Sequence, residues 1–261
     1  MPGEASLLSE QNGGVLTLTL NRPKANAFNQ ELIDALLDAL RRAEAEASVR
    51  CILLTGAGRV FSAGQDVTAL GAVDGQISFR RHLERTYNRL IVRVRRLEKP
   101  VVGAINGAAA GAGLGLALAT DIRLAARSAR FVFGFTGIGL TTDSATSLLL
   151  PLLIGLARAS EVAFMNTPVS AEEALRCGLV NRVVDDADLA AQAAEMAARL
   201  AAGPTRALGL TKRAFNHALL PHLEDVLDYE AHLQEAAGRT ADHHEGVKAF
   251  LEKRQPDFRG V

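Results

Sequence analysis

The sequence has little of what binds nucleic acid, crosses a membrane or cross-links a secreted chain. Its 29 basic and 29 acidic residues give a net charge of zero, which argues against nucleic acid or an anionic membrane as the principal partner. The longest apolar stretch, Ala108 to Ala119, is too short and too rich in glycine to span a bilayer. We therefore expect a small molecule as the main ligand.

Cysteine is scarce, and the start of the chain lacks the pattern of a signal peptide. The two cysteines, Cys51 and Cys177, are far apart and have no CxxC spacing, which is typical of buried thiols in a reducing compartment. The opening residues MPGEASLLSE are acidic and polar, whereas a signal peptide is basic and then apolar. These features predict a cytoplasmic protein.

Spacings that would hold a metal or a nucleotide are also missing. None of the six histidines stands at metal-ligand spacing from a carboxylate or a cysteine, so we expect them on solvated helix faces. The glycines Gly111, Gly113 and Gly115 form G-x-G-x-G, which is not the dinucleotide fingerprint. Their segment also lacks the lysine of a phosphate-binding loop. The sequence therefore predicts no metal and no cofactor.

Strand and helix patterns alternate along the first part of the chain. VLTLTLN places Leu16, Leu18 and Leu20 opposite threonines, the period-two pattern of a strand with one buried face. Asn29 can then cap a helix, and a long arginine-rich helix is expected from Ile77 to Glu98. Further strands are expected in RCILLTG, VVGAIN, DIRLAA, RFVF and LVNRVVD. This alternation indicates an α/β protein.

Helix patterns dominate from Asp143 onward. Ser170 and Glu173 have the spacing of a capping box, and Gly178 stands where a C-terminal cap would lie. Four more helices are expected at residues 189–202, 204–218, 223–237 and 243–253. We therefore predict a core domain over residues 1–203 and a C-terminal helical region over residues 204–261.

Two glycine-containing segments can present backbone amides to a ligand. VFSAGQD, residues 60–66, follows a strand, and its small residues permit a tight turn that leaves N–H groups free. In residues 106–121 a strand ends where glycines and alanines open an apolar helix, whose N-terminus attracts negative charge. The alternatives are an ordinary loop and a helix packed so closely that only Gly and Ala fit.

Asp143 is the candidate acid. Because Ser144, Ala145 and Thr146 follow it, Asp143 satisfies the rule for a helix N-cap, and capping is the more common explanation of such an aspartate. The preceding segment from Phe131 to Leu140 is apolar, however, so the carboxylate can instead face a dry pocket. Burial there would raise its pKa and suit it to act as a general base or acid.

Four segments, in order and across nearly the whole chain, resemble the enoyl-CoA hydratase/isomerase (crotonase) family. They are NRPKANAF, GRVFSAGQD, KPVVGAINGAAAGAGLGLALATDIRLAA and EGVKAFLEKRQPDF. The resemblance implies a crotonase (ClpP/crotonase-like) fold, in which repeated ββα units form two stacked sheets beside a helical C-terminal trimerisation region. It also implies an acyl-CoA thioester partner, with coenzyme A as part of the substrate, and a homotrimer or a dimer of trimers.

The resemblance also assigns residues to the binding of substrate. In the family two backbone N–H groups hold the thioester carbonyl, and the matching residues are Gln65 and Ala112. Such an oxyanion hole stabilises the enolate charge that grows on the thioester oxygen. The residues that would line the path of coenzyme A are Lys24, Ala25, Ala27, Ala63, Asp66, Val67 and Gly111, with Phe250 and Lys253 near it or supplied by a neighbouring subunit. Residues 71–85 and 131–142, Phe135 among them, are expected to shape the acyl pocket.

Two positions depart from the family's hydratases. Those enzymes add water with two glutamates, and the matching residues here are Gly115 and Phe135, neither of which can move a proton. Asp143 falls at a third position, and LTTDSATS resembles the segments of two single-aspartate subgroups, the phenylacetate-pathway enoyl-CoA isomerase and the 4-chlorobenzoyl-CoA dehalogenase. The dehalogenase also needs a tryptophan and a histidine, which correspond to Phe135 and Asn88, so aromatic substitution is disfavoured.

These residues predict an isomerase of fatty or aromatic acid catabolism. Asp143 would move a proton from the α-carbon to the γ-carbon of an enoyl-CoA, while the N–H groups of Gln65 and Ala112 hold the carbonyl. One alternative is an enoyl-CoA hydratase or a ring-opening enzyme, a lyase or isomerase in which Asp143 activates water. Another is a non-catalytic relative that binds acyl-CoA or RNA.

Overall fold

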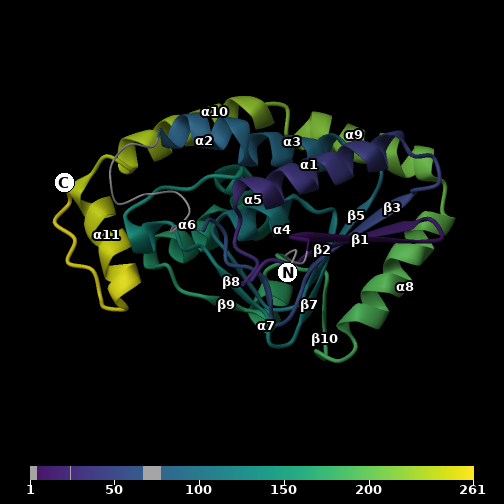
Figure 1. The fold of residues 1–261 in the computed structure, drawn as a ribbon, viewed down its shortest axis with the longest axis horizontal. Coiled ribbons are helices and arrows are strands. Elements are labelled where there is room, and N and C mark those ends of the chain that lie inside the picture. Colours follow the sequence, from purple (N-terminus) through teal and green to yellow (C-terminus); the bar gives the residue numbers. More distant parts are fainter. Residues whose placement is uncertain (1–4, 24, 67–77) are drawn as a thin grey trace.

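Two stacked β-sheets form the centre of the molecule, and most of the helices surround them (Figure 1). The structure, a computed structural model, describes residues 5–23, 25–66 and 78–261. Within that part, one sheet has six strands and the other four. No helix there is long and apolar enough to cross a membrane.

The larger sheet is parallel except at one edge. Its strand order is β1 (Leu7–Asn12), β2 (Val15–Leu20), β3 (Cys51–Gly56), β5 (Val101–Ile105), β7 (Ile122–Ala126) and β10 (Arg182–Val184), with β1 antiparallel to β2. The alternation expected in β2 is confirmed, because Leu18 and Leu20 are fully buried while Thr17 and Thr19 are only half-buried.

The smaller sheet contains the second strand of each ββα unit. Its order is β4 (Val60–Ser62), β6 (Ala108–Ala110), β8 (Arg130–Val132) and β9 (Val169–Ser170), of which β9 runs antiparallel to β8. Consecutive strands alternate between the two sheets, since β3, β5 and β7 lie in the larger one and β4, β6 and β8 in the smaller. The predicted arrangement of repeated ββα units is confirmed.

The helices begin and end close to the expected positions. They are α1 (Gln30–Ala45), α2 (Phe79–Arg85), α3 (Tyr87–Arg96), α4 (Ala112–Ala119), α5 (Thr146–Ile154), α6 (Leu156–Met165), α7 (Ala171–Arg176), α8 (Leu189–Ala202), α9 (Thr205–Leu219), α10 (Leu223–Ala237) and α11 (Ala241–Glu252), with a 3₁₀ turn, η1 (Thr136–Ile138). Asn29 caps α1 by accepting from Leu32 N at 3.0 Å, and Ser170 caps α7 by accepting from Glu173 N at 3.3 Å. The predicted cap at Asn29 is therefore confirmed, as is the Ser170 half of the predicted capping box, whereas the Glu173 side chain pairs with Arg158.

The single long helix expected from Ile77 to Glu98 is wrong. Ile77 lies outside the described residues, and the remainder divides into α2 and α3 at Thr86, whose φ and ψ are −117° and −91°. The Thr86 hydroxyl donates to the carbonyl of His82 at 2.6 Å, and such a local bond competes with regular helix. The break brings the side chains of His82 and Tyr87 to the same side, where both contact Gln65.

The C-terminal helices pack on the core. Helix α10 packs against α2, α3 and α5, and α11 packs against η1. Figure 1 shows α10 running along α2, and α11 at the end of the molecule that carries the C-terminus. The division of the chain at residue 203 stays a prediction, but α10 and α11 contribute to the same cavity as the core.

Candidate active site

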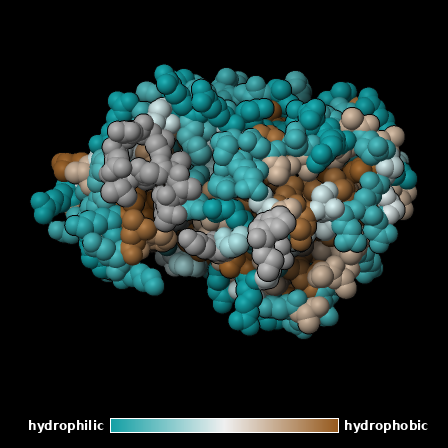
Figure 2. All heavy atoms as spheres, in the orientation of Figure 1, coloured by the Kyte–Doolittle hydropathy of each residue, from teal (hydrophilic) through white to brown (hydrophobic). Residues whose placement is uncertain are grey.

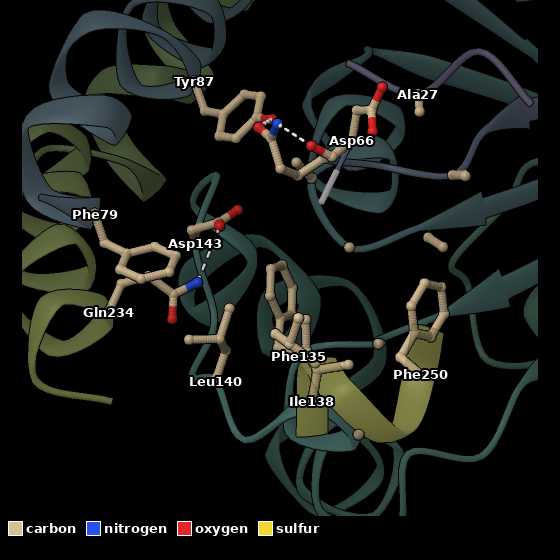
Figure 3. Close-up of a pocket in the computed structure, with 18 of the residues that line it drawn as sticks. Ala27, Asp66, Phe79, Tyr87, Phe135, Ile138, Leu140, Asp143, Gln234 and Phe250 are labelled. Carbon is tan, nitrogen blue, oxygen red and sulfur yellow. Dashed lines mark hydrogen bonds between the residues drawn. The ribbon is translucent and has the colours of Figure 1, made fainter. Parts of the chain in front are cut away.

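A cavity of about 550 Å³ lies where the end of the smaller sheet meets α2, α3 and the C-terminal helices (Figure 3). Its walls are mainly apolar and include Phe79, Leu83, Phe135, Ile138 and Leu140. Asp143 and Asp66 are the carboxylates among its lining residues. This is the form of a small-molecule site, an apolar concavity with a few placed polar groups.

Two loops with free backbone amides meet at one wall of this cavity. Gly64 has a φ of +79°, and a Cβ there would lie 2.6 Å from Ala110 O and 3.2 Å from Ala112 N. The absence of a side chain at Gly64 therefore brings the loop after β4 against the start of α4. A similar close approach holds at Gly113, where a Cβ would lie 2.6 Å from Ser62 O.

The amides of Gln65 and Ala112 are both positioned to face a ligand. Ala112 is the first residue of α4, so its N–H has no acceptor within the helix. Gln65 pairs with Phe28 in a parallel bridge, whose bonds run from Phe28 N to Gly64 O at 2.6 Å and from Asp66 N to Phe28 O at 3.0 Å. The N–H of Gln65 itself therefore points away from Phe28. This geometry suits a two-donor oxyanion hole.

The side chain of Gln65 is anchored on both of its polar atoms. Its Oε1 accepts from the Tyr87 hydroxyl and from His82 Nε2 at 2.9 Å, while its Nε2 donates to the carbonyls of Phe28 and Asp66 at 3.3 and 3.1 Å. Because Oε1 can only accept, His82 must carry its hydrogen on Nε2. Burial lowers the pKa of His82 and raises that of Tyr87, so both are neutral near pH 7.

Asp143 is buried and faces the cavity (Figure 3). Only 6% of the residue is exposed, and its carboxylate accepts from Ser144 Oγ at 2.7 Å and from Gln234 Nε2 at 3.1 Å. Burial raises the pKa of Asp143 to about 6, although these two hydrogen bonds oppose the rise. The expected dry setting is therefore present, and the carboxylate suits proton transfer near neutral pH.

The alternative interpretation of Asp143 as a side-chain cap is wrong. Helix α5 starts at Thr146 after Ala145, and the Asp143 side chain accepts no hydrogen bond from the first turn. The only Asp143 atom that accepts a hydrogen bond from this first turn is the backbone carbonyl oxygen, which accepts from Thr146 N at 3.0 Å. The physical reason is the turn between them, because Ser144 and Ala145 both have a φ of +58° and direct the carboxylate away from the helix.

The two positions that the family resemblance matches to hydratase glutamates, Gly115 and Phe135, cannot supply an acid here. A Cβ on Gly115 would lie 2.4 Å from Ser144 Cβ, so α4 packs directly on the turn that holds Asp143. Phe135 is 5% exposed, lines the cavity and contacts Phe133 edge to face with ring centres 5.0 Å apart. At these two positions the protein therefore has an aromatic ring, Phe135, and a close helix contact at Gly115, and neither is a carboxylate.

The family of the chain follows from comparison with known proteins. The model of the enoyl-CoA hydratase/isomerase family matches residues 10–261. The chain belongs to the enoyl-CoA hydratase/isomerase family. It is 47% identical to the 1,2-epoxyphenylacetyl-CoA isomerase of Escherichia coli (strain K12), over 97% of this chain and 98% of that protein. It is also 38% identical to 4-chlorobenzoyl coenzyme A dehalogenase-2 of an Arthrobacter species, over 85% and 81% of the two chains.

Solved structures agree with this assignment. An enoyl-CoA hydratase from Mycobacterium avium subsp. paratuberculosis K-10 superimposes with a TM-score of 0.89 at 34% identity, covering 98% of this chain and 99% of that one. The protein therefore has the crotonase fold and is an enzyme of the enoyl-CoA hydratase/isomerase family.

Most of the residues assigned by the family resemblance lie together. The cavity lining includes Gln65, Ala112, Asp143, Ala27, Ala63, Asp66, Gly111, Phe135 and Phe250, the last from the same chain. Asp66 also pairs with Arg22 at 2.8 Å. Ala25 and Lys253 are exposed and lie outside this lining. Lys24, Val67 and the part of the expected acyl pocket at residues 71–77 lie outside the described residues.

Sequence reasoning missed several polar residues of the cavity. The expectation that the histidines occupy solvated faces is wrong for His82 and His243, which both line the cavity. His243 is 2% exposed, and its Nδ1 lies 2.9 Å from Ile138 O. Gln234 was missed as well, because a glutamine in an amphipathic helix carries no local signal of a buried partner.

The residues that the structure describes contain no group of three or more His, Cys, Asp or Glu that could hold a metal ion, in this cavity or elsewhere.

Proposed function

We propose that this enzyme is an enoyl-CoA isomerase that uses Asp143 as its single acid and base. The observation that carries the proposal is the position of Asp143, a buried carboxylate of raised pKa that shares a cavity with the amides of Gln65 and Ala112. Neither Gly115 nor Phe135 supplies a second carboxylate beside it, and Asp66, the other carboxylate of the cavity, pairs with Arg22. Transfer of a proton between two carbons on one face of the substrate needs only one such group.

The reaction balances without any co-reactant. The thioester oxygen of a 3-enoyl-CoA accepts hydrogen bonds from the N–H groups of Gln65 and Ala112, which acidifies the protons on the α-carbon. Asp143 removes one of these protons, and the electron pair of the C–H bond forms a dienolate. The protonated Asp143 then returns the proton to the γ-carbon, so that the double bond moves from the β–γ to the α–β position.

The hydrogen bonds around Asp143 support its role as the base. Gln234 Oε1 accepts from Thr141 N at 3.0 Å, so the amide nitrogen of Gln234 is the atom that faces the carboxylate. Ser144 Oγ donates to the other carboxylate oxygen. Two donors fix the orientation of the ionised side chain, while burial keeps it basic enough to accept a proton.

The lining of the cavity supports an acyl-CoA substrate. Phe79, Phe135 and Leu140 offer an apolar surface for a chain or a ring, and the isomerase of Escherichia coli acts, by its name, on 1,2-epoxyphenylacetyl-CoA. Coenzyme A would enter as part of the substrate along Ala27, Ala63 and Asp66. No separate cofactor is required by this chemistry.

Asp143→Asn tests the proposal. We expect kcat for conversion of 3-enoyl-CoA to 2-enoyl-CoA to fall by about 10²–10⁴-fold, with KM little changed, measured by the absorbance of the conjugated thioester. The matched control is Asp188→Asn, because Asp188 is an exposed aspartate before α8 that makes no side-chain cap bond. An Asp143→Asn enzyme that isomerises at the wild-type rate would rule the proposal out.

Addition of water to a 2-enoyl-CoA is the second candidate, favoured by the similarity to the Mycobacterium avium hydratase structure. In that case Asp143 would activate a water molecule instead of taking a carbon-bound proton. Turnover of 2-enoyl-CoA and 3-enoyl-CoA by the same preparation separates the two. Hydration removes the conjugated absorbance, whereas isomerisation creates it.

A further inference from the structure

The first turn of α5 is capped by a side chain from another helix. Glu230 of α10 accepts from Ala145 N at 2.7 Å on Oε2, and from Ser147 N at 2.9 Å and Ser147 Oγ at 2.5 Å on Oε1. Glu230 is 1% exposed. A carboxylate at a helix N-terminus satisfies free N–H groups and is favoured by the helix dipole. Glu230 thus does for α5 what an N-cap residue normally does.

The turn that Glu230 holds is strained. Ser144 and Ala145 follow one another in the left-handed region, each with a φ of +58°, where residues with a side chain are seldom found. Such a conformation persists only where its surroundings hold it. Glu230 binds the amide of Ala145, and Gly115 leaves the space in which Ser144 packs.

Glu230 prevents the Asp143 carboxylate from capping α5. By local capping rules Asp143 would bend back onto the amides of the first turn of α5, but Glu230 occupies the amides of Ala145 and Ser147. The Asp143 carboxylate instead bonds Ser144 Oγ and Gln234. Glu230 and Gln234 lie one turn apart on α10, so the same helix face supports both the turn and the carboxylate.

We propose that Glu230 is a positioning residue for Asp143. It caps α5 in place of Asp143 and so holds residues 143–147 in the conformation that directs the Asp143 carboxylate into the cavity. The catalytic consequence rests on the proposed function, whereas the conformational consequence does not. Glu230 itself does not line the cavity described above.

The titratable groups that face this turn are Asp143 itself, Glu230 from α10 and Tyr87 from α3. Burial raises the pKa of Glu230 to about 7, its three hydrogen bonds oppose the rise, and the nearby Asp143 charge adds to it. Burial, with Asp143 as the next contributor, also raises the pKa of the Tyr87 phenol. Rates are therefore compared at pH 8, where both carboxylates are ionised.

Glu230→Gln tests the inference with a side chain of the same size. The amide replaces one acceptor oxygen by a donor, so it cannot accept from both Ala145 N and Ser147 N. We expect kcat at pH 8 to fall roughly 100-fold, the scale of a displaced catalytic group, with KM and the calorimetric affinity for butyryl-CoA unchanged. Glu224→Gln is the matched control, because Glu224 is an exposed residue of the same helix and pairs with Arg96.

Two further readouts should change if Glu230 holds the turn, and of these the rescue by glycine separates positioning from the loss of the Glu230 charge. In Glu230→Gln, Asp143 would turn onto the amides that Glu230 releases, and these amides stabilise its ionised form. The acid limb of kcat/KM should therefore move to lower pH. Adding Ala145→Gly should recover part of the lost kcat, because glycine adopts a positive φ without strain.

Each result decides the inference. It is overturned by a Glu230→Gln enzyme with near wild-type kcat, by an unmoved acid limb, or by a double variant no more active than Glu230→Gln. If Glu230→Gln does not fold, the double variant is compared with Ala145→Gly alone. Failure of both to fold also overturns the inference, since Glu230 then serves the whole fold. If Asp143→Asn stays active, the proposed function fails. The claim that Glu230 holds the turn of residues 143–147 is then still decided by carbon-13 NMR titration of Asp143 in wild type and in Glu230→Gln.

Discussion

At the scale of single residues, the proposed chemistry depends on the surroundings of Asp143. An aspartate in water is too weak a base to accept a carbon-bound proton efficiently at neutral pH. Burial raises the pKa of Asp143 to about 6, which brings its basicity toward the working pH while leaving it ionised above that value. The donors Ser144 and Gln234 limit the rise.

The pH profile of the reaction should report this residue. Because Asp143 must be ionised to accept a proton, we expect kcat/KM to fall as pH decreases through about 6, with a slope of one in a logarithmic plot. The measurement is the initial isomerisation rate at low 3-enoyl-CoA concentration across the acid range. A profile that stays flat to pH 4.5, with protein shown to be folded, would exclude Asp143 as the base.

The same shift has a cost in stability. The folded-state pKa of Asp143 lies above its ordinary value of 3.8, so protonation favours the folded state. As pH rises from 3.8 to about 6 the unfolded chain loses its proton first, and the contribution of Asp143 to the free energy of unfolding is lost. Asp143→Asn should therefore unfold at an equal or higher temperature than wild type at pH 8, which also serves as a folding control for its loss of activity.

At the scale of elements, the contact between the loop after β4 and the start of α4 brings together the two amides of the proposed oxyanion hole. Gly64 allows the contact because it combines a φ of +79° with the absence of a side chain against Ala110. The break between α2 and α3 adds to it, since His82 and Tyr87 can then both bind the side chain of Gln65. The backbone amides of Gln65 and Ala112 are thus both held in place at the same wall of the cavity.

Gly64→Ala should separate the two loops. A methyl group 2.6 Å from Ala110 O must displace one backbone from the other, and loss of one oxyanion donor typically lowers kcat by about 10²–10³-fold. Gly58→Ala is a matched control, because Gly58 also has a positive φ, +69°, but no atom lies within 4 Å of its added Cβ. Steady-state kinetics that show equal losses in both variants would attribute the effect to backbone strain instead.

At the scale of the whole molecule, the C-terminal helices complete the cavity, and α6 leaves apolar side chains exposed. Helix α10 supplies Gln234, and α11 supplies His243 and Phe250. Figure 2 shows apolar residues at the surface on the side where α11 lies. Leu156, Phe164 and Met165 of α6 are each more than 70% exposed. Large exposed apolar residues that gather on one element commonly mark a protein interface.

We expect these side chains to be covered by further copies of the chain. Size-exclusion chromatography with light scattering should give three or six times the chain mass of 27.7 kDa, as the predicted trimer or dimer of trimers requires. Phe164→Glu should lower the mass, because a charge would be buried at the interface, whereas Arg199→Glu on the exposed face of α8 should not. A wild-type chain that elutes as a monomer at micromolar concentration would contradict the prediction.

Local sequence patterns determined most of the elements and the family of this protein. Periodicity and capping residues identified β2, α1, α7 and the C-terminal helices, because each depends on neighbours within a few positions. Strand β1 was missed because five of its six residues are exposed and show no alternation. The amides of the proposed oxyanion hole could also be assigned from the sequence, since their motifs lie on two short continuous segments.

Only the tertiary structure decided where the Asp143 carboxylate lies and what it contacts. Locally it resembles a cap, and the apolar segment that precedes it allowed a buried acid without deciding between the two. Glu230 and Gln234, about 90 residues further along the chain, occupy the helix end and orient the carboxylate, while Gly115 makes room for the turn. Sequence patterns report interactions between near neighbours, whereas the burial that raises the pKa of Asp143 comes from elements that only folding brings together.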